Sequence, residues 1–262
     1  MKRLFAFVCC LASLAASAAL AANVAPASDK LTAVQIVEKN VAARGGLAAW
    51  RAVSTLTMSG QLDAGGKGDT QLPFVMKLKR QHKSRLEIRF QDQTAVQVYD
   101  GAQGWKLRPF LGRDDVEPYT PAEAKAAATW EELDGPLIDY ASKGTKVDLA
   151  GSELVEGRDA YKLKLTLKTG EQRNVWIDAK TFLDLKIDGE PRKLDGKMHK
   201  VAVYYRSYKT ENGLTTPREL ETVVDRVKKT YKMNIARVVV NEPMPDALFQ
   251  KPQLNVAKAS GQ

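Results

Sequence analysis

Cysteine and histidine are scarce in this chain, with two of each among 262 residues. Cys9 and Cys10 both lie close to the N-terminus, so the remainder of the chain cannot form a disulfide within itself. His82 falls in a predicted turn and His199 in a basic stretch, and neither has the ligand spacing of a zinc site. We therefore expect no metal site and no cofactor, and a protein stabilised by core burial.

Residues 1–21 have the pattern of a cleavable export signal. Lys2 and Arg3 give a positive start, an apolar and small-residue run follows, and Ala19-Leu20-Ala21 fits the small-x-small cleavage pattern. A membrane anchor is the alternative, but alanine and serine dilute the run, which is short of the ~20 strongly apolar residues of a span. Too few residues precede Cys9 for it to be a lipid-modified cysteine. We expect cleavage near Ala21 and a periplasmic mature protein.

Several catalytic and nucleotide-binding motifs are absent as well. The sequence has no G-x-S-x-G or G-x-G-x-x-G stretch, and Gly65-Gly66-Lys67-Gly68 lacks P-loop spacing and is typical of a hairpin turn. Paired acids occur at Asp114-Asp115 and Glu131-Glu132, with Asp134 and Asp139 nearby. Two carboxylates across a groove can hydrolyse a glycoside, so a carbohydrate-active enzyme remains an alternative. We predict that the protein is not an enzyme.

The chain is basic, with 40 Lys and Arg against 31 Asp and Glu and a net charge of +9. Export argues against nucleic acid as the partner, and the basic residues are spread over many predicted strands. Anionic lipid headgroups or an acidic protein suit the compartment better. We assign this docking role to basic residues of one predicted sheet face: Lys77, Lys79, Arg85, Arg89, Lys162 and Lys164.

Period-two alternation of apolar and polar residues begins at Ser54 and predicts an antiparallel sheet with one apolar face. Further strands are predicted around 162–168, 175–177, 183–187, 201–208, 220–224 and 231–240. We assign the apolar residues of the first four strands to a single face, and expect them to line a lipid cavity: Leu56, Met58, Phe74, Met76, Leu86, Ile88, Phe90, Val96 and Val98.

Few helices are predicted. Thr32 is a good cap for a helix over 33–44, Thr120-Pro121 with Glu123 begins a second helix that runs to about Leu133, and a third short segment spans 136–142. No linker or repeat divides the mature chain, so we expect one domain over 22–262, mainly β with α+β character.

The predicted helices are too small to cover the predicted sheet. About ten strands at ~4.8 Å spacing give an apolar face of roughly 1,000 Å². The helices shade on the order of 500 Å² of it. The sheet must therefore curl on itself, pair with another molecule or hold an apolar ligand, and the width of a barrel with this many strands favours the ligand.

Several stretches resemble LolA-like proteins of the outer-membrane lipoprotein-sorting family, over about residues 31–252. They are Ala43-Arg44-Gly45-Gly46-Leu47, Tyr99-Asp100-Gly101 with Gly104-Trp105, Pro109-Phe110-Leu111-Gly112, the run from Asp134 to Tyr140, and Asp246-Ala247-Leu248-Phe249 with Pro252. The resemblance implies a LolA/LppX-like fold, in which a curled sheet of about eleven strands forms an unclosed β-barrel under a few lid helices. It also implies a carrier of acyl chains of lipids or lipoproteins.

The resulting hypothesis is a periplasmic carrier that delivers such cargo towards the outer membrane. The lid would be formed by Trp130, Leu133, Leu137 and Ile138, with a hinge at Gly135-Pro136. Expected partners are the acyl chains, together with a membrane surface or a transport protein of the inner or outer membrane. A lipid-responsive sensor or interaction module without transport remains the alternative from another functional class.

Overall fold

The computed structural model describes residues 31–63, 70–130, 132–228 and 230–253. The expected export signal, the Gly65–Gly68 turn and Glu131 lie outside the described residues. Residues Thr32–Gln262 group into one compact unit. Within the described ranges, no helix is both long and apolar enough to cross a membrane.

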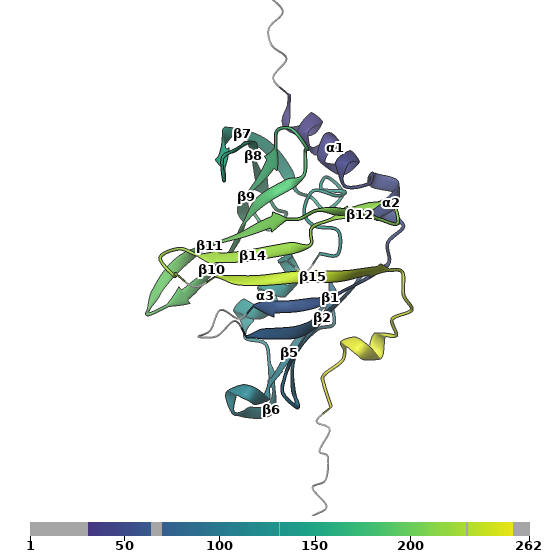
Figure 1. The fold of residues 1–262 in the computed structure, drawn as a ribbon, viewed down its shortest axis with the longest axis vertical. Coiled ribbons are helices and arrows are strands. Elements are labelled where there is room, and N and C mark those ends of the chain that lie inside the picture. Colours follow the sequence, from purple (N-terminus) through teal and green to yellow (C-terminus); the bar gives the residue numbers. More distant parts are fainter. Residues whose placement is uncertain (1–30, 64–69, 131, 229, 254–262) are drawn as a thin grey trace, which may run out of the picture. The chain divides into compact units, whose positions relative to one another are not determined.

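The body of the protein is one antiparallel sheet of thirteen strands that curls without closing (Figure 1). Its order is β6-β5-β4-β3-β2-β1-β15-β14-β11-β10-β9-β8-β7, and β12 and β13 form a separate pair. The strands are β1 (Thr55–Asp63), β2 (Gln71–Lys79), β3 (Lys83–Phe90), β4 (Gln93–Tyr99), β5 (Gly104–Arg108), β6 (Arg113–Pro118), β7 (Lys146–Val155), β8 (Arg158–Thr166), β9 (Gln172–Asp178), β10 (Asp184–Leu194), β11 (Lys197–Arg206), β12 (Lys209–Glu211), β13 (Leu214–Thr216), β14 (Glu219–Val224) and β15 (Tyr231–Val240).

The predicted mainly β fold with an unclosed curled sheet is confirmed, although the sheet has thirteen strands and not about eleven. The strands without a clear alternation in the sequence are the short β5 and the two edge strands, β6 and β7. Nearly every residue of β7 is exposed, and β6 reads Arg-Asp-Asp-Val-Glu-Pro. An edge strand exposed on both faces has no buried face that must stay apolar, which weakens the period-two signal; in β7, Leu149 and Leu154 are 38% and 68% exposed.

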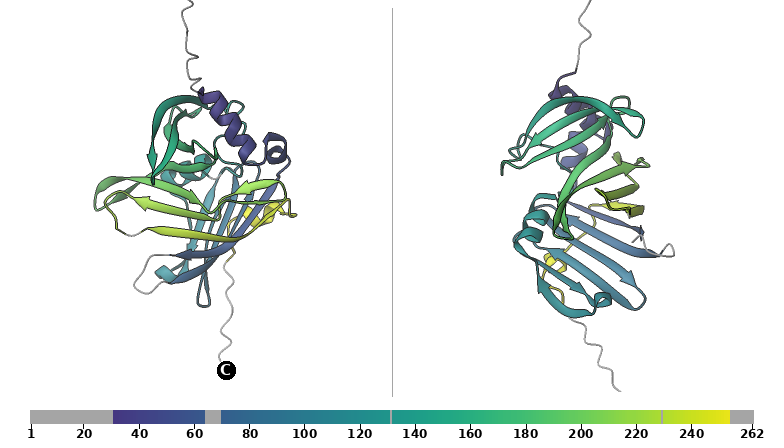
Figure 2. Two further views of the ribbon diagram at one scale, coloured as in Figure 1. Left: turned by 45° about the horizontal axis from the view of Figure 1, so that its top comes forward. Right: turned by 90° about the vertical axis from the view of Figure 1, so that its left-hand side faces the viewer.

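Two meanders share this sheet. Strands β1 to β6 follow one another in sequence and in space, as do β7 to β11, and the late strands β14 and β15 join the two runs. Strand β15 pairs with β1 from Leu56↔Val240 to Asp63↔Lys232, with a bulge at Ser59/Gly60. Figure 2 shows the two runs bending around one concave side.

The helices lie where the sequence places caps. Helix α1 (Ala33–Ala43) begins after Thr32, which forms a capping box with Gln35, and α3 (Pro121–Trp130) begins after Thr120. The short α2 (Leu47–Arg51) and two 3-10 turns, η1 (Pro109–Leu111) and η2 (Asp246–Phe249), complete the set.

Residues 136–142 form a bend followed by consecutive turns, so the expected third helix is wrong. Asp139 has a φ of +52°, and Gly135 before it and Gly144 after it both have a φ of +76°. A left-handed residue in the middle of such a segment breaks the helical hydrogen-bond ladder. The same segment nevertheless packs into the core through its apolar side chains, as described below.

Candidate functional site

The pairing register divides the sheet side chains into two faces. We call the side that carries Leu56 and Met76 the inner face, and the side that carries Arg85 the outer face. The residue triples Met58, Met76 and Leu86, and Gly60, Phe74 and Ile88, lie opposite one another across β1, β2 and β3. Seven of the nine predicted lining residues share this inner face: Leu56, Met58, Phe74, Met76, Leu86, Ile88 and Phe90.

Val96 and Val98 lie on the outer face, so their assignment to the same surface is wrong. They pair with Glu87 and Arg85, respectively. The cause is the two-residue turn between β3 and β4, which pairs Phe90 with Gln93. Paired residues point to the same side, so odd numbers in β4 share the face of even numbers in β3.

The inner-face residues of the first three strands differ in exposure. Leu56 and Phe74 are 4% and 2% exposed, whereas Met58, Met76, Leu86 and Ile88 are only half-buried. Phe90, at the end of β3, is 37% exposed and meets Phe110 edge-to-face at 6.0 Å between ring centroids. A continuous apolar surface is therefore incompletely covered by the rest of the described chain.

The predicted lid segment covers one end of this surface. Leu133 and Ile138 pack in one cluster with Leu56, Leu78 and Trp50, and Leu137 is 1% exposed. Trp130 is the last residue of α3, and its side chain lies outside what the structure describes. The lid role itself stays a prediction.

Charged side chains tie the segment to the sheet. Asp134 is 2% exposed and pairs with Arg80 at the end of β2, which also donates to the carbonyls of Trp50 and Val53. Lys143 donates to Asp134 at 2.8 Å. Farther out, Arg51 bonds Asp139, and this guanidinium lowers the pKa of the Asp139 carboxyl.

Arg218, the residue directly before β14, is a cation beside the inner face, and its side chain is 11% exposed. Arg218 lines a small crevice with Leu214, Val238 and Val240, and Val238 pairs with Met58. One guanidinium nitrogen, Nη2, pairs with Glu211. Its Nε and Nη1 are buried without a hydrogen-bond partner in the described residues. The N–H groups of these two nitrogens can donate to a water or an anion, and the crevice beside them is about 10 Å³.

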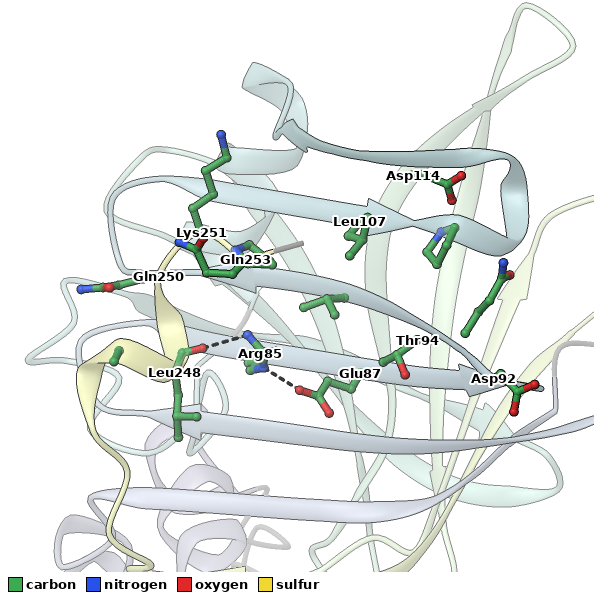
Figure 3. Close-up of a pocket in the computed structure, with 15 residues that line it drawn as sticks. Arg85, Glu87, Asp92, Thr94, Leu107, Asp114, Leu248, Gln250, Lys251 and Gln253 are labelled. Carbon is green, nitrogen blue, oxygen red and sulfur yellow. Dashed lines mark hydrogen bonds and ion pairs between the residues drawn. The ribbon is translucent and has the colours of Figure 1, made fainter. Parts of the chain in front are cut away.

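Three larger grooves have other linings. The largest, about 1040 Å³, lies on the outer face between β3–β6 and the C-terminal segment (Figure 3), and includes Val96, Asp114 and Lys251. A second, about 540 Å³ and mostly apolar, lies between α1, α2 and the 137–142 turns. A third, about 570 Å³, is lined from Lys162 to Val201 by residues of β8–β11.

Sequence reasoning missed the outer groove because its wall is the C-terminal segment, which shows no strand or helix pattern. Met244 and Phe249 are 6% and 0% exposed and pack on Val98. Lys79 bonds the Met244 carbonyl, and Arg85 bonds the Leu248 carbonyl at 3.1 Å. These two residues of the predicted basic docking face are therefore covered by the protein's own chain.

The acidic residues considered for glycosidase chemistry lie in several places in the described chain: Glu132 and Asp134 line one small crevice, and Glu131 lies outside the described residues. Asp134 and Asp139 are engaged by the cations described above, and Asp114 borders the outer groove, on β6. In the described ranges, no group of three or more His, Cys, Asp or Glu residues is placed to hold a metal ion.

Comparison with known proteins gives the fold. A family model described as an uncharacterized protein matches residues 139–256, and a search of curated proteins gave no match. The crystal structure of a LolA superfamily protein from Nitrosomonas europaea is similar with a TM-score of 0.54 at 15% identity, over 85% of this chain and 99% of that chain.

Two further crystal structures have folds similar to that of this chain. A DUF1329 family protein from Desulfovibrio piger has a TM-score of 0.54 at 15% identity, over 83% of this chain and 97% of that chain. A putative outer membrane lipoprotein-sorting protein domain from Vibrio parahaemolyticus has a TM-score of 0.52 at 15% identity, over 84% and 96%. The fold of this chain is LolA-like.

Proposed function

We propose that the protein binds acyl chains of lipids or lipoproteins on the inner face of β1–β3 and carries them through the periplasm. One observation carries the proposal. Met58, Met76, Leu86 and Ile88 form neighbouring cross-strand positions of one apolar face, yet all four remain half-buried. Apolar surface left partly in water on the concave side of a sheet is stabilised by an apolar ligand.

The lining suits ligands of variable shape. Met58 and Met76 face each other across β1 and β2, and unbranched thioether side chains repack around different partners at little cost. Burial of ~12 methylene groups contributes roughly 10 kcal/mol before ordering costs. Such binding is strong enough to hold a chain and weak enough to release it to a better acceptor.

Arg218 supplies a partner for the polar end of the cargo. Its unpaired Nε and Nη1 adjoin Val238 and Val240, which pair with Met58 and Leu56 of the same face. A carboxylate at the end of an acyl chain satisfies these donors once the side chains around the crevice, now about 10 Å³, move apart. The lid segment around Leu133 and Ile138 packs over Leu56, at the same end of the inner face.

The names of similar structures support the class of cargo and the compartment. One is titled a putative outer membrane lipoprotein-sorting protein domain. Together with the export signal expected over 1–21, this supports a periplasmic carrier that delivers towards the outer membrane. The donor and acceptor are then membrane components or proteins that expose acyl chains.

The test is uptake of a fluorescent fatty acid by purified wild type, Ile88→Glu and Leu154→Glu. Ile88 lies on the half-buried inner face, whereas Leu154 in β7 is 68% exposed and serves as the matched control. We expect loss of uptake only in Ile88→Glu, because its carboxylate places a charge on the apolar surface. Normal uptake by Ile88→Glu with an intact circular dichroism spectrum would refute the assignment.

Native mass spectrometry of the protein purified from its own periplasm identifies the cargo. A discrete bound lipid or acylated peptide supports the proposal. An empty protein that also fails to take up fatty acid contradicts it. Arg218→Gln should weaken uptake of a fatty acid more than that of its methyl ester, which lacks the anionic end.

A further inference from the structure

The hairpin of β10 and β11 extends past the strands that flank it. β9 pairs with β10 only as far as Ile187, and β14 pairs with β11 only from Val201. Beyond these positions Arg192↔His199, Lys193↔Met198 and Leu194↔Lys197 pair with one another alone in the described part of the sheet. We call residues 190–200 the β10–β11 arm (Figure 1).

The arm has no core of its own. Residues 190–198 are all exposed, and the strands are joined by the tight turn Asp195-Gly196, with φ +49° and +76°. A two-stranded ribbon without packing is marginally stable in water, so we expect this ribbon to be stabilised by contact with a partner surface. Leu194 is 38% and Met198 66% exposed, which places two large apolar side chains at the solvent-exposed end.

Basic residues surround these apolar side chains. The arm contains Arg192, Lys193, Lys197 and Lys200 against Glu190 and Asp195. Arg192 lies over the Tyr231 ring at 5.8 Å, and no ion pair engages Lys193, Lys197 or Lys200 in the described ranges.

The turn between β14 and β15 adds to this charge. At the base of the arm, the Asp225 carbonyl accepts from Nδ1 of His199, and the Asp225 backbone N–H donates to the Lys200 carbonyl, at 2.8 Å each. The next residues include Arg226, whose side chain is 81% exposed, and the exposed Lys228. The end of the sheet is therefore a positively charged surface with apolar residues at its tip.

The arrangement identifies the partner by its chemistry. Leu194 pairs with Lys197 and Met198 pairs with Lys193, so both sides of the ribbon carry apolar and cationic residues. A protein groove covers one side of a ribbon, whereas the headgroup region of a bilayer surrounds a tip from all sides. We propose that the β10–β11 arm docks on anionic lipid bilayers, with Leu194 and Met198 entering the interface and the lysines contacting headgroups. Asp195 at the turn limits the insertion to headgroup depth.

The test is co-sedimentation of the purified protein with vesicles of phosphatidylcholine, with and without phosphatidylglycerol. We expect binding only to the anionic vesicles, and binding that weakens as salt is added. Lys193→Gln with Lys197→Gln should weaken it roughly 30-fold, because each lysine near an anionic surface contributes about a fivefold gain. Lys146→Gln with Lys168→Gln, at exposed positions elsewhere, is the matched control.

The apolar part of the proposal needs its own variants. Leu194→Ser with Met198→Ser should weaken vesicle binding about tenfold, while Leu154→Ser on β7, about as exposed as Met198, leaves it unchanged. Fatty-acid uptake should be normal in every arm variant, which separates failure of this proposal from failure of the carrier function. Equal binding of wild type and both double variants would overturn the assignment, as would equal binding to neutral and anionic vesicles.

Discussion

The inner face of the sheet has two halves that differ in packing. On β8 and β9, Leu163, Leu165, Val175 and Ile177 are each 0–1% exposed. On β1–β3, Leu56 and Phe74 are also buried, but Met76 and Ile88 are only half-buried. The alternation of apolar and polar residues is equally regular in both halves, so the pattern does not determine how well a face is covered.

The segments that cover the two halves of the inner face explain the difference in their exposure. Helix α1 lies against the β7 side of the sheet, with Ile36 and Val37 at 0% and 2% exposure, and Asn40 donates to the carbonyl of Phe182 at 2.8 Å. The segment around Leu133 and Ile138 covers only the Leu56 end of the other half. One half is therefore a permanent core, and the other is the half that we propose to hold ligand.

The largest effect should come from shortening a leucine in the packed half. Leu163→Ala should lower the free energy of unfolding by about 2–5 kcal/mol, because a fully buried leucine leaves a cavity. Leu86→Ala, at a half-buried inner position, should cost about 1 kcal/mol in the ligand-free protein. Urea unfolding of the delipidated variants measures both. Equal losses would show that the two halves are equally packed.

The cover over the open half should be sensitive to one buried carboxylate. Asp134→Asn removes the charge that Arg80 and Lys143 share at a site 2% exposed, and should cost about 1–3 kcal/mol. We expect faster amide exchange over residues 132–143 in this variant. Asp139→Asn is the control, since its partner Arg51 has a side chain 60% exposed and the loss should be smaller. Unchanged exchange in Asp134→Asn would contradict the role of the ion pair in holding the segment.

Much of the sheet could be predicted from the sequence because one face is apolar. Strand β15 was expected at its observed bounds, Tyr231–Val240, and the resemblance of short motifs to LolA-like proteins gave the fold. The edge strand β6 escaped notice because its residues are mostly polar, and β7 because most of its residues, apolar ones included, are exposed. The expected helix over 136–142 is absent because Asp139 has a left-handed backbone, which no residue pattern in the sequence indicates.

The candidate site was predicted only in part. The register of β1–β3 follows from simple parity, but the two-residue turn after Phe90 moves Val96 and Val98 to the outer face. Arg218 was missed because it lies far from Met58 in sequence and meets the inner face only through β15. Such placements depend on long-range pairing, which local alternation does not encode.

The inner and outer faces of β1–β4 should also differ in function, although the expected effect is smaller. Met76→Ala on the inner face should reduce fatty-acid affinity several-fold. The methionine side chain contributes about 2 kcal/mol of apolar contact, and part of that contact is with the protein and part with the cargo. Val98→Ala, 0% exposed on the outer face against Phe249, should lower stability without changing affinity. Titration calorimetry of both variants, below their unfolding temperatures, tests this. A loss of affinity in Val98→Ala equal to that in Met76→Ala would break the assignment of faces.

The smallest effect concerns the C-terminal segment on the outer face. Lys79 and Lys83 hold the pKa of the Asp246 carboxyl at about 2. An ordinary aspartate in the unfolded chain titrates near ~3.9, so the folded state binds this proton less readily. The stabilisation by Asp246 is therefore fully present above about pH 4 and is lost as the pH falls towards 2.

Carbon-detected NMR titration of the Asp246 carboxyl measures this shift directly. Lys79→Gln and Lys83→Gln should each raise the pKa of Asp246 towards its ordinary value, because each removes one cation from the carboxylate. Asp246→Asn should flatten the acid limb of the stability curve between about pH 4 and 2 while leaving fatty-acid uptake unchanged. An altered uptake in Asp246→Asn would mean that the outer segment and the inner face are coupled through β2 and β3. The two sides of these strands would then act as one site.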